Sequence, residues 1–391
     1  MDRRSFTKLC GLLGISAAFP ISAALRSQLK KTRVGIIGAG AAGMCTGYLL
    51  KALGVEYTLF EASSRVGGRI KEDNTFADFP LSLGAEWLHV APSELDRIAH
   101  KSVNVRLSPY PKTAKVAYFE GGNLYEDEIG DYQDARFTNS SWLGFFEQYL
   151  LPEVKSTLHF DTEITQVNYA DAGVVLTDSR QRQHKFDVVV VTVPLPILRN
   201  ERLRFSPSLP DYKRDAINQA SFWGGIKVFI EFKNHFYPTF LAFPDSETDE
   251  GQYLYYDAAY GHNSSKHVMG LFAVGEQARR YQSLNDADLI NQIFAELTPI
   301  FGEQVRHGYV KHIVQNWNEE PFAMGAYLAD SASYRWPSKL FKPVKDKVFF
   351  AGEAYHTDEE DWGGVHNAAR AARNVVETVS YTHLTLPTST H

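Results

Sequence analysis

The sequence predicts an α/β protein built around a buried parallel sheet, with a second domain beside it. The apolar run at 34–37 ends in the glycine turn at 38–43, which is followed by a helical pattern to Leu53 and a second apolar run at 57–60. Four consecutive valines at 188–191 indicate a strand that is buried on both faces, as in parallel sheets. The chain has 391 residues and 44% apolar content, which is enough for two domains rather than one.

The β-α-β pattern at 34–60 is typical of a dinucleotide-binding site. Gly38 allows a tight turn, Gly40 lets a pyrophosphate approach the backbone, and Gly43 lets the helix pack closely on the strand. The N-terminus of the helix supplies N–H groups and positive partial charge to the phosphates. Glu61 follows the second strand, where a carboxylate accepts the ribose hydroxyls of an adenine dinucleotide. Strand, helix and acid together favour dinucleotide binding over an ordinary glycine-rich turn.

The stretch after Glu61 indicates which dinucleotide binds. Arg65, Gly68 and Arg69 add backbone N–H groups and guanidinium charge where a pyrophosphate would lie. The E-A-x-x-R-x-G-G-R run at 61–69 resembles the FAD-containing amine oxidases, the family of monoamine oxidases, polyamine oxidases and histone-lysine demethylases. The resemblance covers residues 33–378 through six separated motifs. It implies an FAD-binding Rossmann-like doubly wound domain, discontinuous in the sequence, with an α+β substrate domain: the amine oxidase fold.

The same resemblance implies how the chain divides between the domains. The FAD-binding domain is expected to comprise residues 32–90, 154–204 and 340–378, and the substrate domain residues 91–153 and 205–339. Within the substrate domain, the pattern after Val268 predicts an apolar strand and then a helix with an N-cap near Ser283.

Further residues are expected at the cofactor because they match the family's motifs. They are Gly84, Ala85, Glu86, Ile164, Gly352, Glu353 and Val365. The first three match a segment along the isoalloxazine ring, and Ile164 matches a strand whose backbone meets the adenine. Glu353 is expected near the ribityl or pyrophosphate region. Val365 belongs to a helix whose N–H groups can face the pyrimidine end of the flavin and stabilise its anionic reduced form.

Two polar side chains are expected near the substrate. Alternation places Lys227 on one strand face with Phe229 and Glu231, and the residues alone favour a solvated face. The resemblance instead implies that Lys227 holds a water against flavin N5. His89 matches the position where animal polyamine oxidases carry a histidine and plant ones a glutamate, both near the substrate. The alternative for His89 is a histidine that caps or packs at a strand end.

An aromatic cage for the amine is also implied by the resemblance. Tyr327, at the end of the motif W-N-E-E-P-F-A-M-G-A-Y, matches one wall of this cage. Gly364 stands where many relatives place the second wall, so Trp362 is the candidate for that wall. Ala326 stands where monoamine oxidases have the cysteine that binds FAD covalently, so non-covalent FAD is expected. Asn367 departs from the family's usual glycine.

The function implied is that of an FAD-dependent amine oxidase. Hydride passes from the carbon alpha to the amine onto flavin N5, and O2 as acceptor gives imine or aldehyde and hydrogen peroxide. His89 and the acidic run 358–361 favour a polyamine-type substrate, although such runs are also typical of solvated loops. The alternatives are a flavin L-amino-acid oxidase or desaturase on the same fold, or an exported non-oxidase flavoprotein. The amino-acid oxidase would need an arginine for the substrate carboxylate, and the sequence identifies none.

The net charge and the Cys and His residues of the chain indicate which partners to expect. A net charge of −6, with no basic run, gives no reason to expect nucleic-acid binding. The Cys and His residues have no metal-ligand spacing, so no metal is expected. The remaining partners expected are a small-molecule amine and O2.

Both ends of the chain have distinct patterns. Arg3 and Arg4 precede an apolar stretch at 9–24, which resembles a twin-arginine signal peptide at 1–24 that the Tat export machinery reads. The protein is therefore expected to be periplasmic or otherwise exported. The stretch is short and contains Pro20, so no stable membrane span is expected in the mature form. Residues 379–384 can be back-translated to a sequence that resembles the end of a transposon adapter, so residues 379–391 are expected to be a non-native tail; a disordered polar tail is the alternative.

Overall fold

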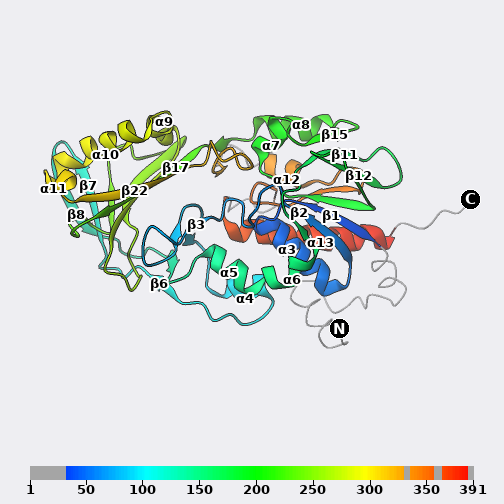
Figure 1. Cartoon of the computed structure of the whole chain (residues 1–391), viewed down its shortest axis with the longest axis horizontal. Helices are drawn as coiled ribbons and strands as arrows, with labels where there is room; N and C mark the ends of the chain where they lie inside the picture. The colour runs from blue at the N-terminus through cyan, green and yellow to red at the C-terminus, as the bar shows by residue number, and fades with distance from the viewer. Residues whose placement is uncertain (1–31, 330–334, 356–362, 386–391) are drawn as a thin grey trace, which may run out of the picture.

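The computed structural model describes residues 32–329, 335–355 and 363–385. Figure 1 shows two lobes: a parallel sheet flanked by helices around β1 and α13, and a larger sheet around β17 and β22 covered by α10. None of the helices in these ranges is long and apolar enough to cross a membrane.

The first lobe is organised around a five-stranded, wholly parallel sheet. Its strands, in spatial order, are β10 (Leu158–His159), β2 (Glu56–Phe60), β1 (Arg33–Ile37), β14 (Val188–Val191) and β24 (Val348–Phe350). Helix α3 (Ala41–Leu53) follows β1 directly and ends at Gly54, which has a left-handed φ of 73°. Segments from the beginning, middle and end of the chain therefore meet in one sheet, as a discontinuous doubly wound domain requires.

Both faces of this sheet are buried, which explains the four valines of β14. Val188 and Val190 belong to a core shared with α3 and with α13 (Val365–Thr385). Val189 and Val191 point to the other face and pack with a second, four-stranded sheet. The strands of that sheet are β13 (Gln183–Phe186), β12 (Val174–Asp178), β11 (Ile164–Asn168) and β15 (Arg204–Ser206). Helices α7 (Leu195–Arg199), α8 (Asp211–Gln219) and α12 (Arg335–Phe341) complete this side.

The second lobe contains an eight-stranded, mostly antiparallel sheet. Its path is β22 (Tyr309–Asn316), β17 (Gly225–Phe232), β21 (His267–Gly275), β20 (Gly251–Asp257), β18 (Phe240–Ala242), β7 (Lys115–Glu120) and β8 (Asn123–Glu128), with β19 (Glu247–Thr248) paired to β20. Strand β17 separates two cores by alternation. Ile226 and Val228 face α10 (Asp286–Phe301), whereas Phe229 packs on the other face against the segment around Leu83.

The helix after β21 begins later than the sequence predicts. Its N-cap is Asn285, whose side chain accepts a hydrogen bond from the backbone N–H of Asp288 at 3.0 Å. The expected N-cap near Ser283 is therefore wrong. Ser283 instead ends a short preceding helix, α9 (Arg279–Gln282), and asparagine caps a helix at least as well as serine.

Residues 91–153, expected in the substrate domain, are divided between the two lobes. Strands β7 and β8 extend the large sheet, as expected. In contrast, α4 (Ser93–Ala99), α5 (Trp142–Tyr149) and α6 (Leu151–Val154) pack into the core formed by β1, α3 and α13. The physical reason is the apolar face of α5, where Trp142, Phe145 and Phe146 are completely or almost completely buried.

Short strands connect the lobes. They are β3 (Glu72–Asp73) with β4 (Leu81–Ser82), β5 (Trp87–Leu88) with β9 (Ala135–Phe137) and β6 (Leu107–Pro109), and β16 (Phe222–Trp223) with β23 (Tyr327–Leu328). At the far end, α13 continues past the expected start of the tail at 379, and Val379 is buried in the first core. The proposed non-native origin of residues 379–391 stays a prediction.

Candidate active site

The glycine turn between β1 and α3 has the geometry that close approach of a ligand requires. Gly38 has a φ of 104°, in the left-handed region, and a Cβ there would lie 2.8 Å from Thr192 Oγ1. A Cβ on Gly43 would lie only 1.8 Å from the Gly38 carbonyl oxygen, so α3 can follow the turn only with glycine here. Gly40 has more room, since the nearest atom to its Cβ would be the Gly67 carbonyl oxygen at 3.8 Å.

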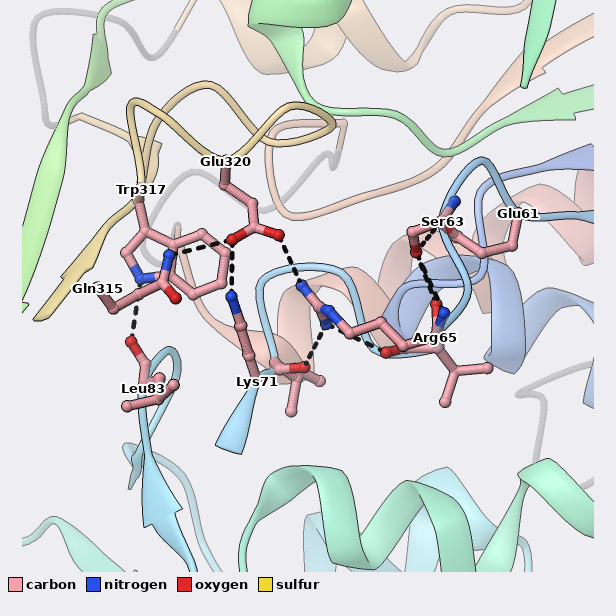
Figure 2. A network of polar contacts seen from close by, with 10 residues as sticks. Glu61, Ser63, Arg65, Lys71, Leu83, Gln315, Trp317 and Glu320 are labelled. Atoms are coloured by element: carbon pink, nitrogen blue, oxygen red, sulfur yellow. Dashed lines mark hydrogen bonds and ion pairs between the residues drawn. The ribbon is translucent and has the colours of Figure 1, made fainter. Parts of the chain in front are cut away.

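Glu61 is fixed beside this turn at the end of β2. Its Oε2 accepts a hydrogen bond from the Ala39 backbone N–H at 2.8 Å. Its Oε1 accepts from the backbone N–H of Ser63 at 2.9 Å and from the Ser63 hydroxyl at 2.7 Å, as Figure 2 shows. The carboxylate is therefore oriented before any ligand arrives, which is the condition for a ribose-binding acid.

Arg65 and Lys71 are tied to the other lobe through Glu320 (Figure 2). Arg65 Nη2 lies 3.3 Å from Glu320 Oε1, and Lys71 Nζ lies 2.8 Å from Glu320 Oε2, which also accepts from Gln315 at 3.1 Å. Burial opposes ionisation of Glu320, but the hydrogen bond and charge of Lys71 hold its pKa below the usual range. The Arg65 guanidinium, which the sequence assigns to a pyrophosphate, is thus also ion-paired with the Glu320 carboxylate of the other lobe.

Arg69 makes a second such link. Its Nη1 donates to Glu353 Oε1 at 2.7 Å and to the Ala326 carbonyl at 2.8 Å. Glu353 follows β24 and is buried, and its Oε2 accepts from the Leu328 backbone N–H at 3.3 Å. Three separated motifs of the sequence therefore converge on one ion pair.

A cavity of about 520 Å³ joins these residues to the large sheet. One part is lined by the glycine turn, Glu61, Ile164, Gly68 and Arg69. The other part is lined by side chains of β17, β20 and β21, with Tyr327 and with the N-terminal end of α13 including Val365. Gly84, Ala85, Glu86, Gly352 and Glu353 also line it. The cavity thus brings together the cofactor residues expected from the sequence except Gly43, which is not in its lining. Contact of each with a cofactor stays a prediction.

The wall of this cavity fits an FAD molecule. Gly40, Gly67 and Gly68 leave a backbone cradle that side chains would fill, because Gly67 and Gly68 have φ values of 98° and 58°. Glu61 suits the ribose, Arg65 and Arg69 suit a pyrophosphate, and the N-terminal end of α13 lies at the substrate part. The donor set therefore matches a dinucleotide.

Lys227 lies in the wall of the substrate part and is only 3% exposed. The structure therefore excludes the solvated face that the residues alone favoured. Its Nζ donates to Glu86 Oε2 at 2.6 Å and to the Ser82 carbonyl at 3.2 Å. Glu86, expected along the flavin ring, thus has the lysine as a direct partner.

His89, which lines the cavity, forms a polar group with two residues that the sequence analysis missed. His89 Nδ1 and the Tyr132 hydroxyl lie 2.8 Å and 2.6 Å from the same atom, Asp134 Oδ2. Burial opposes ionisation of Asp134, but the hydrogen bond and charge of His89 hold its pKa below the usual range. Asp134 is therefore a carboxylate at neutral pH. His89 directly follows β5 with its side chain half exposed, and its role near the substrate stays a prediction.

Of the two residues expected to form the aromatic cage, Tyr327 lies within the described residues, and its role in a cage stays a prediction. Tyr327 lines the cavity, and its ring lies 5.9 Å from the ring of Trp223, tilted by 61°. A Cβ on Gly364 would lie 2.2 Å from the His366 ring, so an aromatic side chain could not occupy 364 without moving that histidine. Trp362, the expected second wall, lies outside the described residues, as does the acidic run at 358–361.

The missed residues share a pattern that the sequence does contain. Tyr132, Asp134 and Arg136 alternate along one short segment that ends in β9, and Arg136 reaches Glu86. Alternating polar residues before a short strand indicate one common face, but they do not say what that face meets. Tyr256, the other missed partner of Glu86, comes from β20.

Comparison with known proteins decides the family. A model described as flavin containing amine oxidoreductase matches residues 143–380, more than half of the chain. The chain belongs to this family. A second model, described as an NAD(P)-binding Rossmann-like domain, matches residues 36–100.

Individual members of the family are distant in sequence. Polyamine oxidase 2 of Arabidopsis thaliana is 24% identical over 441 residues, covering 89% of this chain and 88% of the relative. Lysine-specific histone demethylase 1 homolog 3 of the same plant is 27% identical over 236 residues, but the match spans only 14% of that protein's length.

Solved structures show the fold. A putrescine oxidase solved with putrescine bound has a TM-score of 0.73 at 15% identity, covering 88% of this chain and 98% of that one. Cyclohexylamine oxidase from Brevibacterium oxydans IH-35A has a TM-score of 0.73 at 16% identity, covering 90% and 99%. The predicted amine oxidase fold is confirmed, and the flavin containing amine oxidoreductase described here is an FAD-dependent enzyme that acts on amines.

Proposed function

We propose that this protein oxidises di-cationic, polyamine-type amines, with O2 as acceptor and hydrogen peroxide as a product. The observation that carries the proposal is the Asp134 carboxylate, which is bonded to His89 and Tyr132, two residues that line the cavity. A carboxylate next to the cavity lining suits a second ammonium group on the substrate.

The geometry supports this substrate class in two ways. Both hydrogen bonds to Asp134 use Oδ2, which leaves Oδ1 for a further donor. The cavity lining also includes Phe240, Leu254 and Phe272, whose apolar side chains suit the methylene chain of a diamine.

The reaction is a balanced two-electron oxidation. When bound, FAD accepts a hydride at N5 from the carbon alpha to the amine. For a primary amine the overall change is amine, O2 and water to aldehyde, ammonia and hydrogen peroxide. The protein's part is to orient the amine against Tyr327 and to present the Lys227 ammonium to a water in the cavity. Neither residue needs to act as an obligatory base, because the neutral amine is the reacting species.

The related proteins support the proposal by analogy. Several members matched here are named polyamine oxidases, and one similar fold was solved with putrescine bound. An L-amino-acid oxidase is supported less well, because it needs an arginine for the substrate carboxylate. Among the described residues the arginines that line the cavity are Arg65, Arg69 and Arg202, each paired with a carboxylate.

A peroxide-coupled screen tests the substrate class. Purified enzyme should release hydrogen peroxide with putrescine or spermidine at a higher kcat/KM than with benzylamine or phenylethylamine. Turnover of aryl amines alone or of L-amino acids alone would refute the polyamine proposal. Bleaching of the flavin under anaerobic amine without peroxide release in air would identify a dehydrogenase, and no bleaching with any amine would favour a non-oxidase flavoprotein.

We also propose export through the Tat machinery. The support is the pair Arg3-Arg4 ahead of a short apolar stretch, and these residues lie outside the described chain. The family's need to fold around FAD before leaving the cytoplasm is compatible with this route, which carries folded cargo.

A further inference from the structure

A buried cluster of four residues, one of them Lys227, is built from the second lobe and from the short strands that connect the lobes. Glu86, Arg136 and Lys227 are each 5% exposed or less, and Tyr256 is 1% exposed. Glu86 comes from the segment before β5, Arg136 from β9, Lys227 from β17 and Tyr256 from β20. Their polar atoms meet at a single carboxylate, that of Glu86.

Each oxygen of Glu86 is used within the protein. Oε2 accepts from Lys227 Nζ at 2.6 Å and from the Tyr256 hydroxyl at 2.5 Å, and Oε1 accepts from Arg136 Nη2. Arg136 is itself fixed by the carbonyls of Asp257 and Ala258, at 2.9 Å and 3.0 Å. The carboxylate is thus held from three directions and is committed to these donors rather than to a ligand.

Lys227, by contrast, keeps one donor for the cavity. An ammonium has three N–H donors, and the described residues provide two acceptors, Glu86 and the Ser82 carbonyl. Since Lys227 lines the cavity, the third N–H is available to a water or ligand there. The direction of that N–H is set by the other two bonds.

We propose that Glu86 is a positioning residue, secured by Arg136, that fixes the Lys227 ammonium in the cavity wall and keeps it protonated. The proposal rests on the proposed function only for its kinetic readout. It assigns Glu86 a role through Lys227 and not through direct contact with the cofactor.

The charges around Lys227 explain why a carboxylate such as that of Glu86 is needed to keep the lysine protonated. Burial and the Arg136 charge hold the pKa of Lys227 below its usual value, and the charge and hydrogen bond of Glu86 oppose this lowering. Burial also opposes ionisation of Glu86, but Arg136 and Lys227 hold the pKa of its carboxyl below the usual range. Tyr256 stays neutral because burial raises its pKa well above the ordinary value. The other strands beside Lys227 present uncharged side chains at its register, Phe272 on β21 and Gln315 on β22.

Removal of the Glu86 charge should therefore make the lysine lose its proton at lower pH. In Glu86→Gln we expect amine-driven flavin reduction to be about tenfold slower than wild type near pH 8.5, and within about threefold near pH 6. Dividing the variant's rate of flavin reduction by the wild-type rate at the same pH removes the effect of substrate protonation, which is the same for both enzymes. For Lys227→Met, the rate of flavin reduction relative to wild type should not change with pH. Adding Glu86→Gln to the Lys227→Met variant should introduce no further pH dependence.

The matched control is Glu231→Gln. Glu231 lies on the same face of β17, is 5% exposed and is paired with Lys266 and Lys311, but it does not line the cavity. Its variant should show the wild-type pH profile. An equal pH-dependent loss in Glu231→Gln would show that the effect reports general loss of buried charge, and would overturn the proposal.

A second readout does not use catalysis. Where the folded lysine is neutral and the unfolded lysine is charged, the unfolded state binds one more proton, so stability rises with pH. The thermal midpoint of Glu86→Gln, with and without FAD, should therefore rise more steeply from pH 6 to 9 than that of wild type. Adding Lys227→Met should remove the extra slope. A wild-type slope in the single variant would refute the proposal even if no amine is turned over, so this failure is distinct from failure of the proposed function.

Glu86→Asp keeps the test possible if the glutamine variant does not fold, because it retains a charge for Arg136. The shorter side chain should draw the ammonium back and slow flavin reduction about three- to tenfold at every pH, while the thermal pH slope stays that of wild type. The same change in Lys227→Met should have less than about a twofold effect. Equal slowing in both backgrounds would show that Glu86 acts independently of Lys227.

Discussion

Replacement of Lys227 by methionine tests the catalytic importance of the buried ammonium. Methionine keeps most of the apolar volume, and Glu86 keeps two donors, Arg136 and Tyr256, so no buried charge loses its last partner. The net charge of the cluster falls from +1 to 0. The hydrogen bonds lost are those to Glu86 and to the Ser82 carbonyl, so the free energy of unfolding should fall by only about 1–3 kcal/mol.

The kinetic effect should be larger than this structural one. The variant should bind FAD normally and show flavin reduction, reoxidation by O2, or both, slowed by about ten- to a hundredfold in stopped-flow traces. This corresponds to about 1.4–2.7 kcal/mol of barrier. The physical reason is loss of the third N–H donor, which orients a water in the cavity.

A second buried lysine supplies the control. Lys213 is fully buried and donates to the Leu340 carbonyl at 2.6 Å, but it does not line the cavity. Lys213→Met should leave both half-reactions within about twofold of wild type. If Lys227→Met binds FAD and runs both half-reactions at wild-type rates, or if both variants are slowed equally, the reasoning about Lys227 is refuted.

Four further outcomes are expected. Acid precipitation should release the flavin into the supernatant, because Ala326 offers no nucleophile for a covalent bond; a yellow pellet would contradict this. Asp134→Asn should raise KM for putrescine by about tenfold and KM for a monoamine of similar length by less than about twofold, and equal increases would remove Asp134 from substrate recognition. Changing Arg3-Arg4 to Lys-Lys should retain the protein in the cytoplasm of a Tat-competent host, as cell fractionation would show; unchanged periplasmic activity would refute this route. Burial lowers the pKa of Lys213 to about 6, so above pH 6 the unfolded state binds the extra proton and stability should rise with pH. Lys213→Met should flatten this rise in thermal unfolding between pH 6 and 9, and an unchanged slope would show that Lys213 is not neutral in the folded protein.

Local chemistry explains which parts of the fold were predictable. The glycine turn, helix 41–53 and the two strands beside it follow from backbone sterics and hydrophobic period, so their positions agree with the sequence within a residue. The four valines predicted a strand buried on both faces, and β14 contributes to a core on each side. The sequence placed the N-cap near Ser283 rather than at Asn285, because serine and asparagine are both good caps and these two residues stand two positions apart.

The sequence by itself also identified Glu61 from its place after the second strand of the β-α-β unit, whereas Tyr327 and Lys227 were implied by resemblance to the amine oxidase family. It could not determine that Lys227 is buried, since alternation gives a face but not what covers it. Only the tertiary structure decided that the Glu86 carboxylate accepts hydrogen bonds from both Lys227 and Arg136, and that Asp134 is bonded to His89. These partners come from segments tens of residues apart, and ion pairs over such separations follow from the packing of the two lobes, which no local pattern records.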